Sequence, residues 1–146
     1  MDFIVKDLDY NYRLDAFRNK ADKIIFEISS EISTANCPYC GKESKRIHSI
    51  YQREIQDLPI QRKKVVLLVS TRKFFCDNDM CCKRTFSERH TFVDANGKRT
   101  KRLEKNILFT SSQLSSINAS KVLKNSNVDI SKSSICVLLK KNAIDC

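Results

Sequence analysis

The pattern of hydrophobic and polar positions divides the chain into a strand-rich first part and a helical second part. Runs of β-branched and aromatic residues predict strands over residues 23–28, 46–51, 53–58 and 63–75. The last run contains the apolar stretch VVLLV at residues 65–69, which predicts a strand covered on both faces in its middle. Pro59 is expected to interrupt the strand pattern, because proline cannot donate a ladder hydrogen bond. Residues 1–22 mix apolar and charged residues without a clear period, and the pattern predicts no element there.

The spacing of apolar residues changes after a predicted turn at residues 94–97. From there on, apolar residues recur every three to seven residues. This spacing predicts a helix that begins near Thr100. Two shorter helices are predicted over residues 119–124 and 131–141, with Ser131 as the N-cap of the second. Their shared core is expected to contain Val122, Leu123, Ile130, Ile135, Leu138 and Leu139. Their more exposed residues are expected to be Lys132, Ser133, Ser134, Val137, Lys140 and Lys141.

Two pairs of cysteines give the strongest chemical signal. Cys37 and Cys40 form a C-x2-C pair, and Cys76 and Cys81 form a C-x4-C pair. Short loops of this kind turn two thiolates toward one point, and zinc(II) accepts four such ligands tetrahedrally. Gly41 follows the first pair and can adopt a positive φ where the chain reverses. We therefore expect one structural zinc ion bound by these four cysteines, and its binding to contribute to folding.

Other roles for cysteine and histidine residues are less favoured. The first residues are too few and too charged for a signal peptide, so a cytoplasmic location with reduced thiols is expected rather than disulfide bonds. Cys82 directly follows Cys81 and could replace it as a ligand, whereas Cys136 and Cys146 lie far downstream in the helical part. His48 lies in a strand pattern without a partner at metal spacing, which favours a surface or packing role.

Together these patterns predict an α+β protein. Residues 1–95 are expected to hold an N-terminal segment and a small zinc-bound antiparallel β domain of the zinc-ribbon type, with its zinc core at 23–90. Residues 96–146 are expected to form an all-α helix-turn-helix module. An ordinary helical hairpin would show the same spacing as the last two helices, so spacing alone leaves both interpretations open.

Charge is unevenly distributed along the chain. The net charge of +10 combines −2 in residues 1–36 with +12 in residues 37–146. Four thiolates and one zinc ion would lower the total to about +8, which still favours a polyanionic partner such as nucleic acid. No apolar run is long enough to span a bilayer. Several basic clusters could contact phosphates: Arg62, Lys63, Lys64, Arg72, Lys73, Lys83, Arg84, Lys98, Arg99, Lys101 and Arg102. In the last predicted helix, Lys132, Ser133 and Ser134 are the candidates for contacts with base edges. Lys140 and Lys141 of the same helix are further candidate DNA contacts.

Five segments share an order and spacing that is more specific than any single cysteine pair: residues 37–41 (CPYCG), 47–53 (IHSIYQR), 57–59 (DLP), 72–78 (RKFFCDN) and 86–89 (FSER). In this arrangement they resemble the zinc-binding head of the ISL3 family of insertion-sequence transposases. Residues 99–103 (RTKRL) and 131–135 (SKSSI) are similar to the helix-turn-helix module of that family. The resemblance covers residues 23–142.

The resemblance implies a protein that recognises the terminal inverted repeats of a mobile element as double-stranded DNA. Cys37, Cys40, Cys76 and Cys81 would then be the zinc ligands, and residues 131–141 the recognition helix. One departure is that Gln61 and Arg62 stand where a glycine is expected in the turn after residues 57–59. Another is that the RNase H-like catalytic domain of the family is expected after the helix-turn-helix, but the sequence stops at Cys146. We therefore expect a truncated DNA-binding unit and not an enzyme. Besides DNA, its candidate partners are a second copy of the chain and a full-length transposase.

Two functions from other classes are consistent with the same residues. A zinc ribbon can be a docking surface for another protein, and the acidic residues 1–36 could bind a partner or the basic face. A zinc module with Tyr51, Phe74, Phe75 and Phe86 could instead stack unpaired RNA bases, although a core position is the favoured interpretation of these aromatic residues. Chelator-sensitive binding to duplex DNA distinguishes these functions from the transposase hypothesis.

Overall fold

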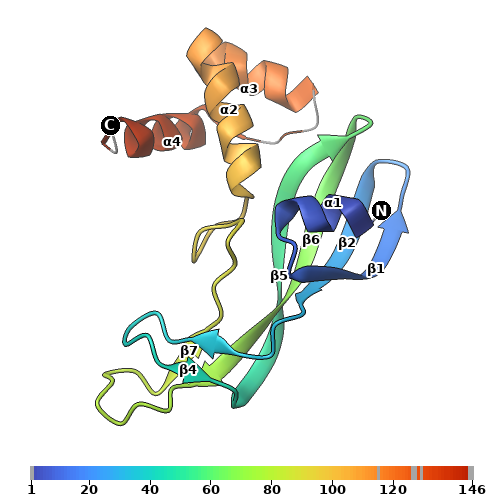
Figure 1. Cartoon of the computed structure of the whole chain (residues 1–146). Coiled ribbons are helices and arrows are strands. Elements are labelled where there is room, and N and C mark those ends of the chain that lie inside the picture. The colour runs from blue at the N-terminus through green and yellow to red at the C-terminus, as the bar shows by residue number, and fades with distance from the viewer. Residues whose placement is uncertain (1, 115, 126–127, 129, 145–146) are drawn as a thin grey trace.

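The computed structural model of the chain describes residues 2–114, 116–125, 128 and 130–144, without the side chains of Asp2, Ser116 and residues 141–144. Three parts follow one another in space (Figure 1). A sheet with one helix on it forms the sheet body, a cysteine-containing lobe lies at one end of a long hairpin, and three helices lie near the hairpin's other end. The elements are α1 (Asp2–Leu8), β1 (Tyr12–Asn19), β2 (Lys23–Ser30), β3 (Ala35–Asn36), β4 (Glu43–Ser44), β5 (Ile47–Ile60), β6 (Lys63–Phe75), β7 (Thr85–Ser87), α2 (Lys101–Gln113), α3 (Ser116–Asn125) and α4 (Lys132–Ile144).

The main sheet has the strand order β1-β2-β6-β5, and β7 pairs with the end of β6. The expectation of an antiparallel β domain is wrong in one pairing, because β2 runs parallel to β6. The chain leaves β2 through the first cysteine loop and returns along β5 before it enters β6 beside β2. Hydrophobic periodicity shows which face of a strand is buried but not which strand pairs with it, so the pattern could not reveal this crossover.

The N-terminal residues form two elements that the sequence pattern did not reveal. Helix α1 packs on one face of the sheet through Val5, and β1 adds an edge strand antiparallel to β2. Both belong to the core of the sheet body, which contains Val5, Tyr12, Ile24, Phe26, Ile28, Ile55, Val65, Leu67, Val69, Phe92 and Val93. Strand β1 is largely exposed and bulged between Leu14 and Ala16, which explains its irregular pattern.

A chain of hydrogen bonds crosses this core. The Tyr12 hydroxyl bonds to Nδ1 of the buried His90, and Nε2 of the same ring lies 3.0 Å from Thr71 Oγ1. The Thr71 hydroxyl in turn donates to the Val69 carbonyl oxygen at 3.2 Å. Burial lowers the pKa of His90 to about 4 and also raises the pKa of Tyr12, so both groups are neutral near pH 7. The neutral ring fits its partners as an acceptor from Tyr12 and a donor to Thr71.

The long hairpin departs from the expected break at Pro59. Strand β5 continues through this residue to Ile60, with a register irregularity between Asp57 and Ile60 that accommodates the proline. Gln61 and Arg62 form the turn with φ values of 50° and 62°. A two-residue hairpin with positive φ at both positions normally favours Asn-Gly, so this turn forms without its preferred residues. The middle of β6 is buried at three consecutive positions, Val65 to Leu67, as its apolar pattern predicts, and alternates afterwards.

The helical module, α2 to α4, has its own core of Leu103, Ile107, Ala119, Leu123, Val128, Ile130 and Ile135. Helix α2 begins where predicted, with Thr100 as its N-cap accepting a hydrogen bond from the Leu103 amide. Ser131 caps α4 through a 3.2 Å hydrogen bond from the Ser134 amide, which confirms the predicted cap. The predicted core was wrong at Val122 and Leu139, whose side chains are 45% and 36% exposed, because a three-helix core takes only a narrow stripe from each helix.

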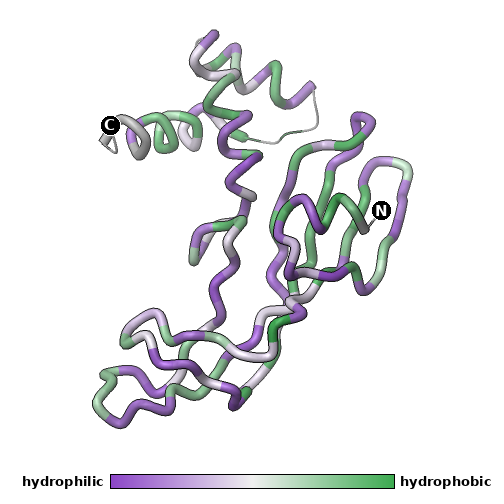
Figure 2. The backbone as a smooth tube through the Cα atoms, in the orientation of Figure 1, coloured by the Kyte–Doolittle hydropathy of each residue, from purple (hydrophilic) through white to green (hydrophobic). Residues whose placement is uncertain are grey.

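Figure 2 shows hydrophobic residues recurring along all three helices, with hydrophilic residues at the start of α2. None of the helices in the described residues is both long and apolar enough to cross a lipid bilayer.

Candidate functional site

The first cysteine loop is a tight turn between the short strands β3 and β4. The Gly41 amide donates to the Cys37 carbonyl oxygen at 2.7 Å, and the Cys37 amide donates to the Lys42 carbonyl oxygen at 2.9 Å. Gly41 has a φ of 82°, which a residue with a side chain rarely adopts. These bonds reverse the chain over four residues and bring the thiols of Cys37 and Cys40 to the same side.

The second cysteine loop follows β6 and is closed by polar contacts of Asn78. Its side-chain oxygen accepts from the Met80 amide at 3.0 Å, and its carbonyl oxygen accepts from the Cys81 amide at 3.0 Å. The Cys76 amide donates to the Arg84 carbonyl oxygen at 2.8 Å, which joins the start of the loop to the residues before β7. The longer C-x4-C spacing is thus folded into a defined turn.

Four sulfur atoms from these loops meet at one point. The Sγ atoms of Cys37, Cys40, Cys76 and Cys81 all lie within 4.8 Å of one another. Cys37 and Cys81 are 3.9 Å apart, and Cys40 and Cys76 are 3.5 Å apart. A tetrahedral zinc ion with Zn–S bonds of about 2.3 Å requires sulfur pairs about 3.8 Å apart. The residues therefore fit a structural zinc ion, and the sequence-predicted ligand set is the one that the structure brings together.

The electrostatics of the four sulfurs favour a bound cation. The Lys42 backbone amide and the Asn78 side chain donate to Cys40 and lower the pKa of its thiol to about 6. At Cys81 the Lys83 amide acts in the same direction, but burial and the neighbouring thiols outweigh it and raise the pKa to about 12. Without a metal, one thiolate thus suppresses ionisation of the others, whereas a divalent cation stabilises all four as thiolates.

Contacts around the sulfurs join the two loops. Asp77 of the second loop accepts from Arg46 Nε at 2.6 Å, and its carbonyl oxygen accepts from Lys42 Nζ at 3.1 Å. The Arg46 guanidinium lies 5.1 Å from the centre of the Phe75 ring. Beneath the loops, Phe74 and Phe86 stack with ring centres 5.6 Å apart and pack against Cys37 in a small core. We refer to residues 35–46 and 73–87 as the cysteine lobe.

Other candidate ligands lie outside this cluster. Cys82 is exposed and is not in the group of four, although it neighbours Cys81. His48 hydrogen-bonds Ser49 and packs edge-on against Phe75, which matches the packing role expected for it. Cys136 lies in α4, and Cys146 lies outside the described residues.

The comparison with known families explains this arrangement. Residues 33–86 match the family described as the zinc-finger of transposase IS204/IS1001/IS1096/IS1165. This segment is similar to the zinc ribbon of ISL3-type transposases. The match begins just before the first cysteine pair and ends in β7, so it contains all four clustered cysteines. No curated protein and no solved structure matches the chain.

The match to a transposase zinc finger suggests contact with nucleic acid. Two of the arginines predicted for that role are held by buried carboxylates. Arg72 makes a two-pronged ion pair with Glu88, with distances of 3.2 and 2.8 Å, and its backbone amide also donates to Glu88. Arg102 makes a similar pair with the buried Asp57, which also accepts from the Thr100 hydroxyl at 2.7 Å. These pairs join separate segments of the chain, a role that cluster composition alone could not reveal.

Three other predicted basic residues come together although they are far apart in sequence. Lys64 of β6 and the neighbouring Lys98 and Arg99 line one surface pocket with a volume of about 440 Å³. Of the remaining predicted phosphate contacts, Lys63 bonds to Asn19 at 2.8 Å, and Lys73 lies half-buried in β6. The others are exposed: Arg62, Lys83, Arg84 and Lys101. The basic residues thus form a pocket on the sheet and scattered single positions.

Helix α4 exposes most of the residues predicted to read bases. Lys132, Ser133 and Lys140 are exposed and Ser134 is half-buried, while the side chain of Lys141 lies outside the described part of the structure. Val137 is 64% exposed in the middle of the helix, an unusual position for an apolar residue, and was not among the predicted contacts. Ser133, Val137 and Lys140 are spaced i, i+4 and i+7, so they form one exposed stripe.

The aromatic residues considered for RNA stacking are mostly unavailable. Phe74 and Phe86 are buried in the cysteine lobe, and Phe75 is covered by His48 and Arg46. Tyr51 is exposed on β5. A stacking platform of these four residues is therefore not present on the surface.

Proposed function

We propose that this chain is a DNA-binding unit of an ISL3-type transposase that recognises the terminal inverted repeats of a mobile element. The observation that carries the proposal is the match of residues 33–86 to a transposase zinc finger, together with the sulfur cluster that the match contains. The charge of +12 on residues 37–146 supports a duplex DNA partner, because each neutralised phosphate releases counterions.

In this proposal α3 and α4 act as a helix-turn-helix. Ile130 and Ile135 anchor the turn and the start of α4 in the helical core, while the stripe of Ser133, Val137 and Lys140 faces outward. A recognition helix contacts bases with its N-terminal half, where serine and lysine can hydrogen-bond base edges and valine can contact a thymine methyl group. Helix α4 has these residue types on its exposed stripe.

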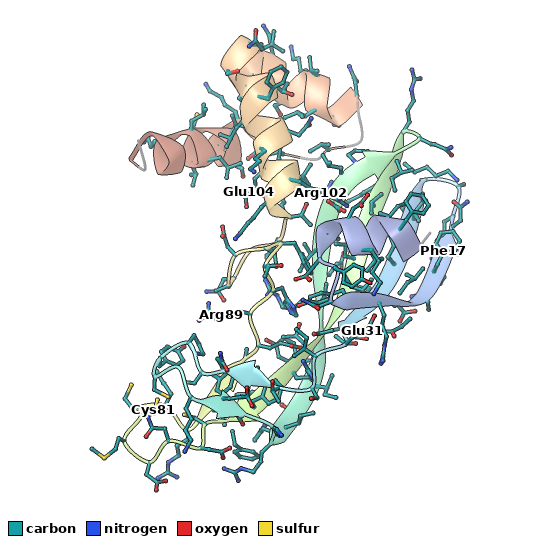
Figure 3. The ribbon with its side chains drawn as sticks, viewed as in Figure 1. Phe17, Glu31, Cys81, Arg89, Arg102 and Glu104 are labelled. Carbon is teal, nitrogen blue, oxygen red and sulfur yellow. The ribbon has the colours of Figure 1, made fainter. Side chains whose placement is uncertain are left out.

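The zinc ribbon contributes a second contact at a distance from α4. Figure 3 shows Cys81 at the tip of the cysteine lobe and Arg102 at the start of α2, near opposite ends of the β5–β6 hairpin. Strand β5 spans 14 residues, which corresponds to roughly 45 Å at about 3.3 Å per residue. One turn of B-DNA is about 34 Å, so contacts separated by most of this length would lie on different turns of one duplex.

The same proposal assigns binding, and not strand transfer, to these residues. Strand transfer requires carboxylates that hold two metal ions about 4 Å apart. Among the described residues the metal-binding group consists of four cysteines, whose chemistry suits zinc in a structural role. Incubation of the zinc-loaded chain with labelled inverted-repeat ends and Mg²⁺ is expected to leave the DNA uncut.

The experiment that tests the proposal measures fluorescence anisotropy of labelled duplexes with the zinc-loaded protein. Duplexes from the DNA that flanks the gene are compared with scrambled duplexes, before and after chelation. Cys40→Ser is expected to abolish preferential binding, whereas the neighbouring but non-clustered Cys82→Ser serves as a matched control and is expected to bind normally. Ser133→Ala with Lys140→Ala is expected to remove the sequence preference while leaving zinc content unchanged.

Equal, salt-sensitive binding to every duplex would reject recognition of inverted repeats. Absence of DNA binding would favour the second candidate, a protein-interaction module. That candidate is supported by Ile47, Ile50 and Tyr51, which are exposed on the part of β5 next to the cysteine lobe. Exposed apolar residues on an edge strand are typical of a protein-binding surface.

A further inference from the structure

The pocket that unites Lys64, Lys98 and Arg99 lies on the face of the sheet opposite α1. The pocket is lined by alternate residues of the paired strands β5 and β6, which point to the same face of the sheet. Gln56 of β5 pairs with Val66 of β6, and Glu54 lies two residues before Gln56 on that face. The intervening Ile55 points to the core beneath α1. The pocket therefore lies on a rigid sheet surface and not on a flexible loop.

The backbone of Gln56 fixes one edge of this pocket. Its amide donates to the Lys98 carbonyl oxygen at 2.8 Å, and its carbonyl oxygen accepts from the Thr100 amide at 2.9 Å. These two bonds hold the segment that carries Lys98 and Arg99 beside β5 as a short parallel bridge. Cationic side chains from β6 and from this segment are thus positioned around the pocket before any ligand binds.

The side chain of Gln56 has an unused donor at this site. Among the described residues, its Nε2 atom is buried and has no acceptor within hydrogen-bonding distance. Buried amide groups are nearly always hydrogen-bonded, so this donor indicates a ligand that supplies an acceptor. Three cationic side chains and the Glu54 carboxylate give the pocket a net formal charge of +2, which indicates that the acceptor is an anion.

We propose that this pocket binds a phosphoryl group through the Gln56 amide, Lys64, Lys98 and Arg99, and that in the DNA complex the group is a backbone phosphate. The assignment to DNA rests on the proposed function, whereas the phosphoryl pocket itself does not. A phosphate offers several oxygen acceptors around one centre, which matches donors that converge from two strands and the adjoining segment. The volume of about 440 Å³ also leaves room for bridging water.

The first test is NMR of the zinc-loaded full chain with a ¹⁵N-labelled glutamine side chain. Inorganic phosphate is expected to shift the Gln56 side-chain amide signal saturably, whereas chloride at equal ionic strength is not. A duplex from the flanking DNA is expected to shift the same signal. Gln56→Met removes the donor at similar length, and Gln52→Met, on the same face of β5, is the matched control.

The second test measures duplex affinity across salt concentrations. Lys64→Gln is expected to reduce the slope of log affinity against log salt concentration by roughly 0.9, the value for one neutralised phosphate. The same charge change at the exposed Lys20 is expected to leave this slope unchanged. Gln56→Met is expected to weaken binding threefold or more, and Gln52→Met less than twofold. Glu54→Gln is expected to tighten binding about fivefold, the factor for ~1 kcal/mol between unit charges 4 Å apart in water. A gain in affinity cannot result from misfolding.

The outcomes separate the pocket from the proposed function. If the duplex binds tightly while the Gln56 signal stays unmoved, and Gln56→Met, Lys64→Gln and Glu54→Gln all bind like the parent, the pocket assignment is overturned and the DNA-binding function stands. If inorganic phosphate shifts the signal but no duplex binds, the DNA-binding function is rejected, and the pocket is confirmed as a site for a free phosphorylated molecule. If neither phosphate nor DNA shifts the signal, the pocket assignment fails whatever the affinity for DNA.

Discussion

Replacing Asp57 by asparagine is expected to loosen the helical module from the sheet. The Asp57 side chain is 1% exposed and lies at the end of β5, where it receives two hydrogen bonds from Arg102 and one from the Thr100 hydroxyl. Thr100 is also the N-cap of α2. One carboxylate therefore fixes both the start of the helix and its attachment to the hairpin, and it raises the pKa of Arg102 by the same hydrogen bonds.

The expected cost of Asp57→Asn is about 2–3 kcal/mol in the free energy of unfolding. Removing one partner of a fully buried ion pair typically costs ~3–5 kcal/mol, because the other charge remains buried. Arg102 is 32% exposed, so water can solvate part of its guanidinium and the cost is smaller. The asparagine keeps the size of the side chain, so no cavity contributes to the change.

The assay is urea unfolding of the zinc-loaded protein, combined with hydrogen exchange of the first turn of α2. The matched control is Asp15→Asn, which removes a carboxylate from an exposed pair with Arg13 and is expected to cost less than about 0.5 kcal/mol. In a double-mutant cycle with Arg102→Gln, the coupling energy is expected to lie between about 1 and 3 kcal/mol. A coupling energy near zero, or equal effects of Asp57→Asn and Asp15→Asn, would refute the role of this pair as a clamp.

Three further changes test other parts of the structure. Chelation or Cys40→Ser is expected to unfold the cysteine lobe, with one zinc ion lost per chain by mass spectrometry, whereas Cys82→Ser retains the metal. Arg62→Gly is expected to raise the free energy of unfolding by about 1 kcal/mol, because glycine adopts the φ of 62° without strain. Thermal unfolding measures this change, and a lower melting temperature in the variant would contradict the prediction. The pKa of His90 falls from 6.5 to about 4 on folding, because burial disfavours the charged ring. The free energy of unfolding is therefore expected to be highest above pH 6.5 and to decrease by up to about 3 kcal/mol as the pH falls toward 4. His90→Gln is expected to flatten this pH dependence in urea unfolding.

Local chemistry made the zinc site predictable from sequence. The spacing of Cys37 and Cys40 and the following Gly41 specify a turn whose geometry depends on few other residues, and the structure has that turn. The cap at Ser131 was predictable for the same reason, since a capping side chain bonds to an amide three residues away. The start of α2 near Thr100 was also predicted, although its cap was not. Features that are determined within about four residues were therefore recovered.

Features that depend on long-range pairing were not recovered. In the sequence, Asp57 and Glu88 have no feature that distinguishes them from exposed carboxylates. In the structure each is buried against an arginine that is distant in the chain, Asp57 against Arg102 and Glu88 against Arg72. The parallel pairing of β2 with β6 and the strand β1 have the same origin. The residues next to a carboxylate in the sequence do not show whether it will be buried against a distant arginine or exposed to solvent.

The clamp at Asp57 also bears on how two weak contacts could recognise one DNA end. A flexible connection would let the zinc ribbon and α4 bind independently, at an effective concentration set by the connecting chain. Here the Gln56 backbone bonds, the Asp57 pair and Leu58 in the helical core fix the helices to the end of β5. Under the proposed function, the spacing of the two modules would then become part of the recognition, because only a duplex that presents both sites at that separation would engage them together. The phosphoryl pocket lies beside the same junction, so a backbone phosphate there would hold the DNA in register between them.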